Sequence, residues 1–516
     1  MNIADHAITA TDSPALIIDG GTISFGELHA RSQRVAALLH DAGLRRGDGV
    51  ALVLPNRSDF FEITWGCQLS GLYYTAVNTH FTPDEVAYVI DDSDAKAVFL
   101  DITEASMGDL AAHVRNVNTA VEVHLAVGGV GATLPGWWAY EDALAAAGDP
   151  PPLSDGSEML YSSGTTGRPK AVRRPLPSDG NGSWAQSVLE MALTHKYGMT
   201  QSSVYLSPAP LYHAAGVNYT MAVNRVGAAS IVMGKFDAET VLRLIETHGV
   251  THAQFVPTMF VRMLKLPKTV RDKYDVSSLR CVIHAAAPCP VDVKHQMMEW
   301  FGPIIHEYYG GTEGFAGTTI GPEEWLAHPG SVGIPMAPVH VVDEYGQELP
   351  IGESGELYFE GGPDFEYFKD PAKTASVYND RGWRSLGDMG YVAEDGYMYL
   401  TDRSTFMIVS GGVNIYPQEA ENVLVMHPKL VDAAVFGVPN DEFGEEVKAV
   451  VQAVEGVTPG PDLEAELIEY CRARLAGYKC PRTVEFEPEL PRDPNGKLYK
   501  RRIRERYWQG RVSRIV

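Results

Sequence analysis

Residues 161–172, with the sequence YSSGTTGRPKAV, concentrate side chains that bind phosphate. Four hydroxyls, two glycines and a lysine lie within ten residues. Glycines let the backbone curl so that its N–H groups converge on an anion, hydroxyls add donors, and lysine supplies a point charge. The spacing does not match the Walker pattern. The candidate phosphate contacts are Ser162, Ser163, Gly164, Thr165, Thr166, Gly167 and Lys170, and the hydroxyl of Thr165 or Thr166 could also reach a metal ion.

The same composition would also suit a flexible Ser/Gly linker. However, the hydrophobic residues 159–161 precede the stretch and residues 171–172 follow it, which favours a loop held between two strands. We therefore predict a phosphate-binding loop at this position.

Two carboxylates further along the chain are candidates for binding the rest of a nucleotide. Glu313 comes two residues after a glycine pair and shortly after a strand predicted over residues 303–306. This position suits Mg²⁺, which prefers one or two carboxylates together with phosphate oxygens. Asp388 lies between predicted short strands, where it could accept a bidentate pair of hydrogen bonds from ribose hydroxyls. The alternative for each residue is a solvated carboxylate in a turn.

Three other segments carry candidate functional residues, but the residue types alone do not distinguish a functional role from a structural one. A proline-rich loop over residues 207–216 delivers His213, which alone is more readily interpreted as a core histidine. Gly411 and Gly412 leave room for a narrow ligand. The Asn-Gly pair at 495–496 is a strong turn signal that presents Lys497, although a lysine on a turn is most often solvated.

In their order along the chain, these segments resemble the motifs of the adenylate-forming (ANL) superfamily, which contains acyl-CoA synthetases, luciferases and peptide-synthetase adenylation domains. The phosphate loop matches the family pattern at every position, and five further motifs follow between residues 207 and 497. The resemblance implies an AMP-forming acid–thiol ligase that uses ATP, Mg²⁺ and coenzyme A. A carboxylate attacks the α-phosphate of ATP, pyrophosphate leaves, and a thiol then displaces AMP from the acyl adenylate.

The resemblance also implies a role for each candidate. Besides the phosphate loop, it places ATP or AMP against Ala286, Tyr309, Gly310, Thr312, Asp388, Arg403 and Lys497, with Tyr309 stacked on the adenine. It assigns catalysis to Lys497, Thr166, His213 and Glu313, and the metal to Glu313 and Thr165. It lines the acyl pocket with His213, Ala215, Gly216, Ala285 and Gly311, and the coenzyme A tunnel with Gly411 and Gly412.

The chain departs from the family pattern at the expected hinge between domains. Arg403 is followed by Ser404, Thr405 and Phe406, whereas the family commonly has a charged residue two positions after the arginine. Thr405 is still expected to be the pivot. The apolar Phe406 indicates different packing in one of the two domain poses.

Helical segments alternate with short apolar ones, which predicts an α/β fold with mainly parallel sheets. At 516 residues the chain needs more than one core. We expect an N-terminal domain over residues 1–404, made of two doubly wound subdomains and a small distorted β-barrel formed by short alternating strands between residues 332 and 399. A small mobile α+β domain is expected over residues 405–516.

Composition narrows the possible partners. The net charge of −24 opposes general nucleic-acid binding, and it means that ATP must be held by local positive groups. Five scattered cysteines indicate free thiols in a reducing cytoplasm, and we find neither a signal peptide nor an apolar run long enough to cross a membrane. A C-terminal run of basic residues indicates a solvated face, a steering element for coenzyme A or a contact with an anionic membrane. The sequence leaves the oligomeric state undetermined, with a homodimer as one alternative.

The acid is the least constrained feature of the sequence. Residues 214–216 and 285–287 are all small, which predicts a roomy pocket for a medium- or long-chain fatty acid or a bulky ring-bearing acid, unless their small size serves only close backbone packing. The alternatives are an aryl-CoA ligase and an enzyme that loads a carrier-protein thiol. A luciferase-like oxidation and a non-catalytic nucleotide-binding module are more distant.

Overall fold

The computed structural model describes residues 2–18, 20–103, 107–128, 134–162, 169–176, 184–403, 406–411, 413–440, 442–492 and 498–509. The chain forms two compact units. The first comprises Met1–Gln254, Tyr274–Cys281 and Asp364–Ala375, and the second comprises Phe255–Lys273, Val282–Pro363 and Ser376–Val516. The domain boundary predicted at residues 404 and 405 lies outside the described residues and stays a prediction.

A six-stranded parallel sheet forms the centre of the first unit. Its strands run in the order β7 (Trp138–Ala139), β6 (Val123–Val127), β5 (Ala95–Asp101), β3 (Gly49–Val53), β4 (Tyr73–Ala76) and β8 (Ser157–Glu158). Alternate residues of β3 belong to two different hydrophobic cores, Val50 and Leu52 to one and Ala51 and Val53 to the other. Both faces of the sheet are therefore covered, which confirms the predicted doubly wound arrangement.

The helices of this unit follow the sequence signals closely. They are α2 (Phe25–Asp41), α3 (Ser58–Ser70), α4 (Pro83–Asp92), α5 (Met107–Val117) and α6 (Tyr140–Ala146). A capping box at Ser24 starts α2: its hydroxyl accepts from the backbone of Glu27 while the Glu27 carboxylate accepts from the backbone of Ser24. An equivalent box at Thr82 starts α4.

A second set of strands in the first unit runs in the order β13 (His252–Phe255), β11 (Val204–Ser207), β12 (Ala229–Val232), β1 (Pro14–Ile18) and β2 (Gly21–Ser24). All neighbours are parallel except the hairpin of β1 and β2. Helices α8 (Ala214–Val226) and α9 (Ala238–His248) complete the alternation. The short antiparallel pair β9 (Leu160–Ser162) and β10 (Lys170–Val172) flanks the predicted phosphate loop, as expected.

In the second unit, β14 (Cys281–His284) is parallel to β15 (Ile305–Gly310). An antiparallel series follows, in the order β15, β16 (Gly317–Ile320), β17 (Ser331–Pro335), β21 (Met398–Arg403), β20 (Arg384–Val392), β19 (Gly355–Phe359) and β18 (Val339–Val342). The helices α10 (Pro257–Leu264) and α12 (Val291–Phe301) precede and follow β14 in the chain. The alternating strands predicted between residues 332 and 399 are antiparallel, but antiparallel pairing begins earlier, between β15 and β16.

Two predicted strand boundaries are wrong. The strand predicted over residues 303–306 begins at Ile305 and continues to Gly310, because the aromatic residues Tyr308 and Tyr309 pair with β16. The segment around Asp388 does not lie between short strands. It lies inside the nine-residue strand β20, where Asp388 pairs with Arg403 of β21.

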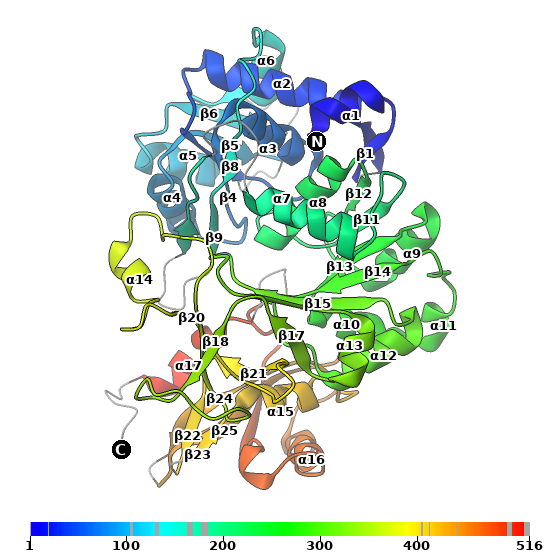
Figure 1. Ribbon diagram of the computed structural model, residues 1–516, viewed down its shortest axis with the longest axis vertical. Coiled ribbons are helices and arrows are strands. Elements are labelled where there is room, and N and C mark those ends of the chain that lie inside the picture. Colours follow the sequence, from blue (N-terminus) through cyan, green and yellow to red (C-terminus); the bar gives the residue numbers. More distant parts are fainter. Residues whose placement is uncertain are drawn as a thin grey trace. The chain divides into compact units, whose positions relative to one another are not determined.

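The C-terminal part of the second unit has its own sheet and core. The strands run in the order β23 (Val413–Ile415), β22 (Ile408–Ser410), β25 (Gly444–Ala453) and β24 (Leu430–Asn440), with β26 (Thr483–Phe486) also paired to β25. Helix α15 (Pro417–Leu424) packs against β24 (Figure 1). Helix α16 (Pro461–Arg472) packs against β26. This is the predicted α+β arrangement.

All five cysteines are free thiols, as predicted, and none is exposed. Within the residues that the structure describes, no helix combines the length and the apolar character needed to cross a bilayer.

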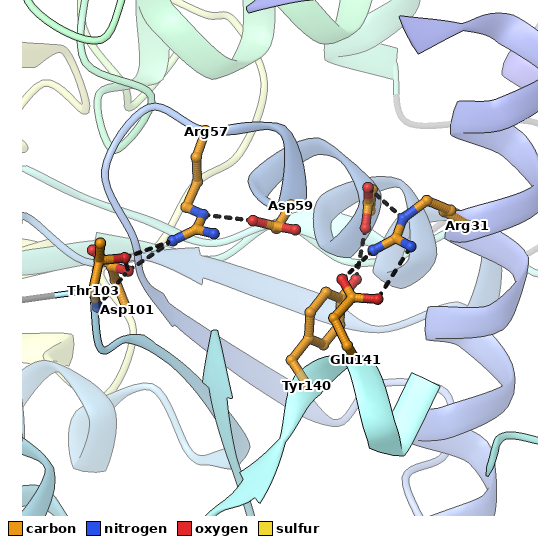
Figure 2. Close-up of polar contacts among 8 residues, drawn as sticks. Arg31, Arg57, Asp59, Asp101, Thr103, Tyr140 and Glu141 are labelled. Atoms are coloured by element: carbon orange, nitrogen blue, oxygen red, sulfur yellow. Dashed lines mark hydrogen bonds and ion pairs between the residues drawn. The ribbon is translucent and has the colours of Figure 1, made fainter. Parts of the chain in front are cut away.

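A buried carboxylate joins helices α2, α3 and α6 of the first unit. Glu62 lies 2.6 Å from the guanidinium of Arg31 and accepts a hydrogen bond of 2.9 Å from Tyr140. Burial raises the pKa of Glu62, and the contacts with Arg31 and Tyr140 oppose that increase. Arg31 also pairs with Glu141, the residue after Tyr140 (Figure 2).

We expect Tyr140→Phe to lower the free energy of unfolding by about 1–3 kcal/mol, because a buried carboxylate would lose a hydrogen-bond donor. Urea denaturation of the variant and of the wild type measures the change. Tyr345→Phe is the matched control, because 79% of Tyr345 is exposed. Equal effects of the two substitutions would contradict this account.

Candidate active site

The carboxyl ends of parallel strands in the first unit carry polar residues. Arg57 follows β3 and lies 2.5 Å from Asp59 and 2.7 Å from Asp101, which ends β5 (Figure 2). The order in which strands are added to the sheet reverses at β3, because β4 pairs with one edge of β3 and β5 pairs with the other. Such a switch point is where open α/β sheets place their functional loops.

Asn56, which the sequence analysis missed, fixes the loop that ends at His213. Its amide donates to the carbonyls of Ala209 (2.9 Å) and Met233 (2.7 Å), and its carbonyl oxygen accepts from the backbone N–H of Leu211 (2.7 Å). Asn56 is 8% exposed, so these bonds are shielded from water. An asparagine directly after the strand-ending Pro55 was the available signal.

His213 is the residue that precedes the first turn of α8. Its backbone is extended, and its ring centroid lies 4.7 Å from that of Tyr212. The structure thus places His213 at the junction of the Asn56-bound loop and the helix.

At least one small residue of this loop serves close backbone packing. A Cβ added to Gly216 would lie 2.4 Å from the carbonyl oxygen of Pro210, so glycine is required here for close backbone packing. The roles predicted for Gly216 and for the partly exposed Ala215 in the acyl pocket stay predictions.

The described parts of the phosphate loop are its two ends. Ser162 on β9 pairs with Lys170 on β10, so the strands close the loop in register. The Lys170 ammonium lies 5.6 Å from the ring centroid of Tyr367. Ser163, Gly164, Thr165, Thr166 and Gly167 lie outside the described residues, so their roles stay predictions.

The second unit brings together Tyr309 and Asp388, two residues for which the resemblance implies nucleotide contacts. The Tyr309 hydroxyl donates to the Asp388 carboxylate at 2.7 Å. Asp388 is 7% exposed, and it pairs along the backbone with Arg403. Next to it, the Ser385 hydroxyl donates to Glu356 at 2.7 Å and accepts from the backbone of Gly387.

Glu313 follows the same strand and is held by close packing. It is 9% exposed, and the Thr312 hydroxyl lies 3.3 Å from one of its oxygens. A Cβ on Gly311 would lie 2.5 Å from that same carboxylate, so the Glu313 side chain packs closely over this glycine. The described residues contain no cluster of three or more ligating side chains.

Ala286 has a backbone conformation that alanine rarely adopts. Its φ is +75°, in the left-handed region, directly after the strand β14 and the buried Ala285. Only glycine adopts this region without cost. Strain of this kind often occurs at functional sites.

A buried cluster of charged and polar groups lies beneath these two strand ends. Glu307 on β15 lies 2.6 Å from the ammonium of Lys294 on α12 and 3.2 Å from the ring of His284 on β14. His284 and Lys294 are 0% exposed and Glu307 is 6% exposed. Burial alone would raise the pKa of Glu307, but His284 and Lys294 overcome this and lower it to about 2. The cluster ties the segment before Ala286 to the segment before Tyr309.

In the C-terminal part of the second unit, Gly411 has a φ of +57° and its backbone N–H donates to Phe443. A Cβ on Gly411 would lie 3.1 Å from the ring of Phe443, so the glycine permits this close packing. Gly412 and Thr405 lie outside the described residues. Phe406, the other hinge departure, lies beneath the ammonium of Lys500 at 5.2 Å from its ring centroid.

Lys497 also lies outside the described residues, but the segments on either side of it are anchored. Arg492 forms a bidentate pair with Asp432, and Lys500 lies 2.8 Å from Glu421. Basic residues of α17 (Lys500–Trp508) also pair with carboxylates: Arg501 with Glu505, Arg504 with Glu445 and Arg506 with Glu487. These pairs reduce the free positive charge expected of a steering or membrane-binding face.

We expect Ala286→Gly to raise the free energy of unfolding by about 1 kcal/mol, because it removes the left-handed strain of alanine. Ala287→Gly is the control, because its φ is not positive and the substitution should be neutral or destabilising. Thermal denaturation compares the two variants. A decrease for Ala286→Gly would show that the alanine side chain contributes packing that outweighs its strain.

We expect Lys294→Met alone to cost about 3–5 kcal/mol of stability, because it leaves the Glu307 carboxylate buried beside a neutral histidine. The double variant Lys294→Met/Glu307→Leu should recover most of that loss, since apolar residues of similar volume replace the pair. Urea denaturation of the wild type, the single variant and the double variant measures both effects.

The same pair predicts a pH dependence. Because folding lowers the pKa of Glu307 from 4.5 to about 2, its contribution to stability is present above pH 4.5 and is lost as the pH falls toward 2. The double variant should lose less stability than the wild type across that interval. Parallel curves for the two proteins would contradict the assignment.

Comparison with known proteins agrees with this geometry. A family model described as AMP-binding enzyme matches residues 3–363, and one described as AMP-binding enzyme C-terminal domain matches residues 419–497. The chain is 32% identical to the fatty acid–acyl-carrier-protein ligase ScoC of Streptomyces coeruleorubidus over 99% of this chain and 96% of that protein. It is 33% identical to feruloyl-CoA synthase of Amycolatopsis sp. over 95% of both.

A solved structure gives the same result for the fold. ATP-bound MatB from Rhodopseudomonas palustris matches with a TM-score of 0.80 and 30% identity over 99% of both chains. The chain therefore belongs to the AMP-binding enzyme family and is an adenylate-forming ligase of the acyl-CoA synthetase type.

Proposed function

We propose that the protein activates a medium- or long-chain fatty acid, or a bulky ring-bearing acid, as its acyl adenylate and transfers the acyl group to coenzyme A. The observation that carries the nucleotide half of this proposal is the buried pair of Tyr309 and Asp388. A carboxylate held by a tyrosine hydroxyl can still accept hydrogen bonds from two ribose hydroxyls through its remaining lone pairs.

In the first step, an oxygen of the acid attacks the α-phosphorus of ATP, and the bond to pyrophosphate breaks. The reaction needs positioned charge rather than a protein nucleophile. Lys497 and the phosphate loop would supply positive charge and N–H donors, while His213 orients the carboxylate. When bound, Mg²⁺ neutralises charge on the phosphate oxygens.

Glu313 is the residue that would hold Mg²⁺, together with the hydroxyl of Thr165. One buried carboxylate fits this ion, because Mg²⁺ takes most of its ligands from phosphate oxygens and water when it accompanies a nucleotide. The 9% exposure of Glu313 and its place directly after the nucleotide-binding strand support this assignment.

In the second step, the thiol sulfur attacks the carbonyl carbon of the adenylate, and AMP leaves. Coenzyme A is the proposed acceptor because Gly411 and Gly412 leave room for a narrow ligand. A carrier-protein thiol is the second candidate, since the relative ScoC is named as an acyl-carrier-protein ligase. Thioester formation with free coenzyme A and with a phosphopantetheinylated carrier protein separates the two.

The proposed acid class rests on the absence of bulky side chains at Ala214, Ala215 and residues 285–287. Relatives named for feruloyl, 2-succinylbenzoate and long-chain fatty acid substrates support a large acid. Acid-dependent pyrophosphate release with a panel of acids tests the proposal. We expect octanoate and larger acids to give a higher kcat/KM than acetate or propionate, and the reverse order would overturn it.

Lys497 and Gly412 should separate the two half-reactions. Lys497→Ala should reduce pyrophosphate release by about 100-fold or more, because it removes a charge that stabilises the transition state. The same variant should still convert a supplied acyl adenylate into the thioester. Gly412→Leu should do the opposite, because a side chain would obstruct the thiol.

Stopped assays of each half-reaction measure these effects, and circular dichroism checks that both variants fold. If both folded variants lost both half-reactions equally, the account in which one mobile domain serves two poses would be wrong. Because Thr405 and Phe406 replace the usual hinge residues, this protein is a stringent test of domain rotation.

A further inference from the structure

Arg225, in the last turn of α8, is a buried arginine that the reaction above does not use. It is 7% exposed, and its guanidinium carbon lies 4.9 Å from the ring centroid of Trp65. Its nearest carboxylate among the described residues is Glu190, at 3.5 Å, and its guanidinium forms no hydrogen bond to any of them. A buried guanidinium with five donors needs an oxygen partner.

Arg225 lines a small, mostly apolar cavity together with a few polar side chains. The cavity has a volume of about 30 Å³ and lies within the first unit. Its lining residues are Tyr74, Glu158, Leu189, Asn218, Met221, Ala222 and Arg225. A space of this size admits one water molecule or the last atoms of a larger molecule.

The position of the cavity along α8 relates it to the acyl pocket. Residues 214, 218, 221, 222 and 225 share one face of the helix by their spacing of three and four. Ala214 directly follows His213, and the helix rises about 16 Å between Ala214 and Arg225. The cavity therefore lies along the helix face that begins at the residue expected to orient the carboxylate.

The charges around the cavity favour a neutral guest. Arg225 lies near Glu190, and Glu158 lies 3.6 Å from Arg174, so two positive groups face two negative ones. A carboxylate placed here would be buried beside Glu158 and Glu190. A hydroxyl would accept from Arg225 and donate to Glu158, whereas a methyl group would offer the guanidinium no hydrogen-bond acceptor.

We propose that this cavity, named here the Arg225 cavity, receives the far end of the acid and selects acids that carry a neutral oxygen, a hydroxyl or a ketone, at that end. The inference rests on the proposed function, because it takes His213 as the carboxylate end of the acyl pocket. It adds a second polar recognition point to a pocket otherwise expected to be apolar.

Acids of equal length test the proposal on the intact wild-type protein. Dodecanoate, its ω-hydroxy derivative, the corresponding methyl ketone and dodecanedioate are compared by pyrophosphate release. We expect the hydroxy acid and the ketone to exceed dodecanoate in kcat/KM by about tenfold or more, because a site built for an oxygen rejects the analogue that lacks it. The dicarboxylate should be the poorest substrate.

Substitutions of the cavity residues test whether the preference for the oxygen-bearing acids arises in the Arg225 cavity. Arg225→Met should bring the ratio of hydroxy acid to dodecanoate close to one, and Arg225→Lys should retain part of the preference. Glu158→Gln should reduce activity with the hydroxy acid more than with the ketone, because only the hydroxyl donates a hydrogen bond to Glu158. Arg34→Met, which removes an arginine that binds backbone carbonyls elsewhere, should leave the ratio unchanged.

Equal kcat/KM for dodecanoate and its hydroxy derivative in the wild type would overturn the proposal and leave the cavity as a site for water. An unchanged ratio in Arg225→Met would also overturn it. If Arg225→Met does not fold, the wild-type ratio and Glu158→Gln still decide. Absence of pyrophosphate release with every acid would instead count against the proposed function itself.

Discussion

Parallel pairing of neighbouring strands is the constraint on which the candidate sites depend. In the first unit it places Arg57 and Asp101 at one edge of a sheet, after β3 and β5. In the second unit it places Ala285 and Tyr309 at the ends of β14 and β15. Parallel strands need long connections, so residues far apart in sequence meet at these edges. The chemistry is therefore carried by short segments that the sheets hold in register.

Buried polar side chains hold these segments in place, and they find their hydrogen-bond or ion-pair partners in different ways. The Asn56 side chain forms three hydrogen bonds, all to backbone atoms, so it fixes a loop without burying a charge. Lys294 and Glu307 bury charge as a pair, which stabilises little by itself. Their value lies in specifying one arrangement of two strand ends. Arg225 is the exception, because it lines a cavity and its contact with Glu190 is a long ion pair of 3.5 Å.

Much of the fold could be predicted from local sequence signals. Helix caps and buried strands have local signatures, and both the capping box at Ser24 and the apolar run of β3 are visible in the sequence. The extent of β15 was missed because its tyrosines pair with a later strand, which is a long-range effect. The motif residues Tyr309 and Asp388 were found through the family resemblance. Asn56 and Arg225 were not, since their roles come from contacts with residues more than a hundred positions away or from a cavity.

The state of the cysteines has a consequence for the fate of the acyl group. An acyl adenylate reacts with any accessible thiolate, and a thiolate forms only where the thiol can lose its proton. Burial raises the pKa of Cys67, Cys281, Cys289, Cys471 and Cys480. The protein's own sulfur atoms are thus poor competitors for the activated acid. An enzyme built in this way can hold a potent acylating agent without acylating its own cysteines, so that the thiol arriving from outside meets no competition from them.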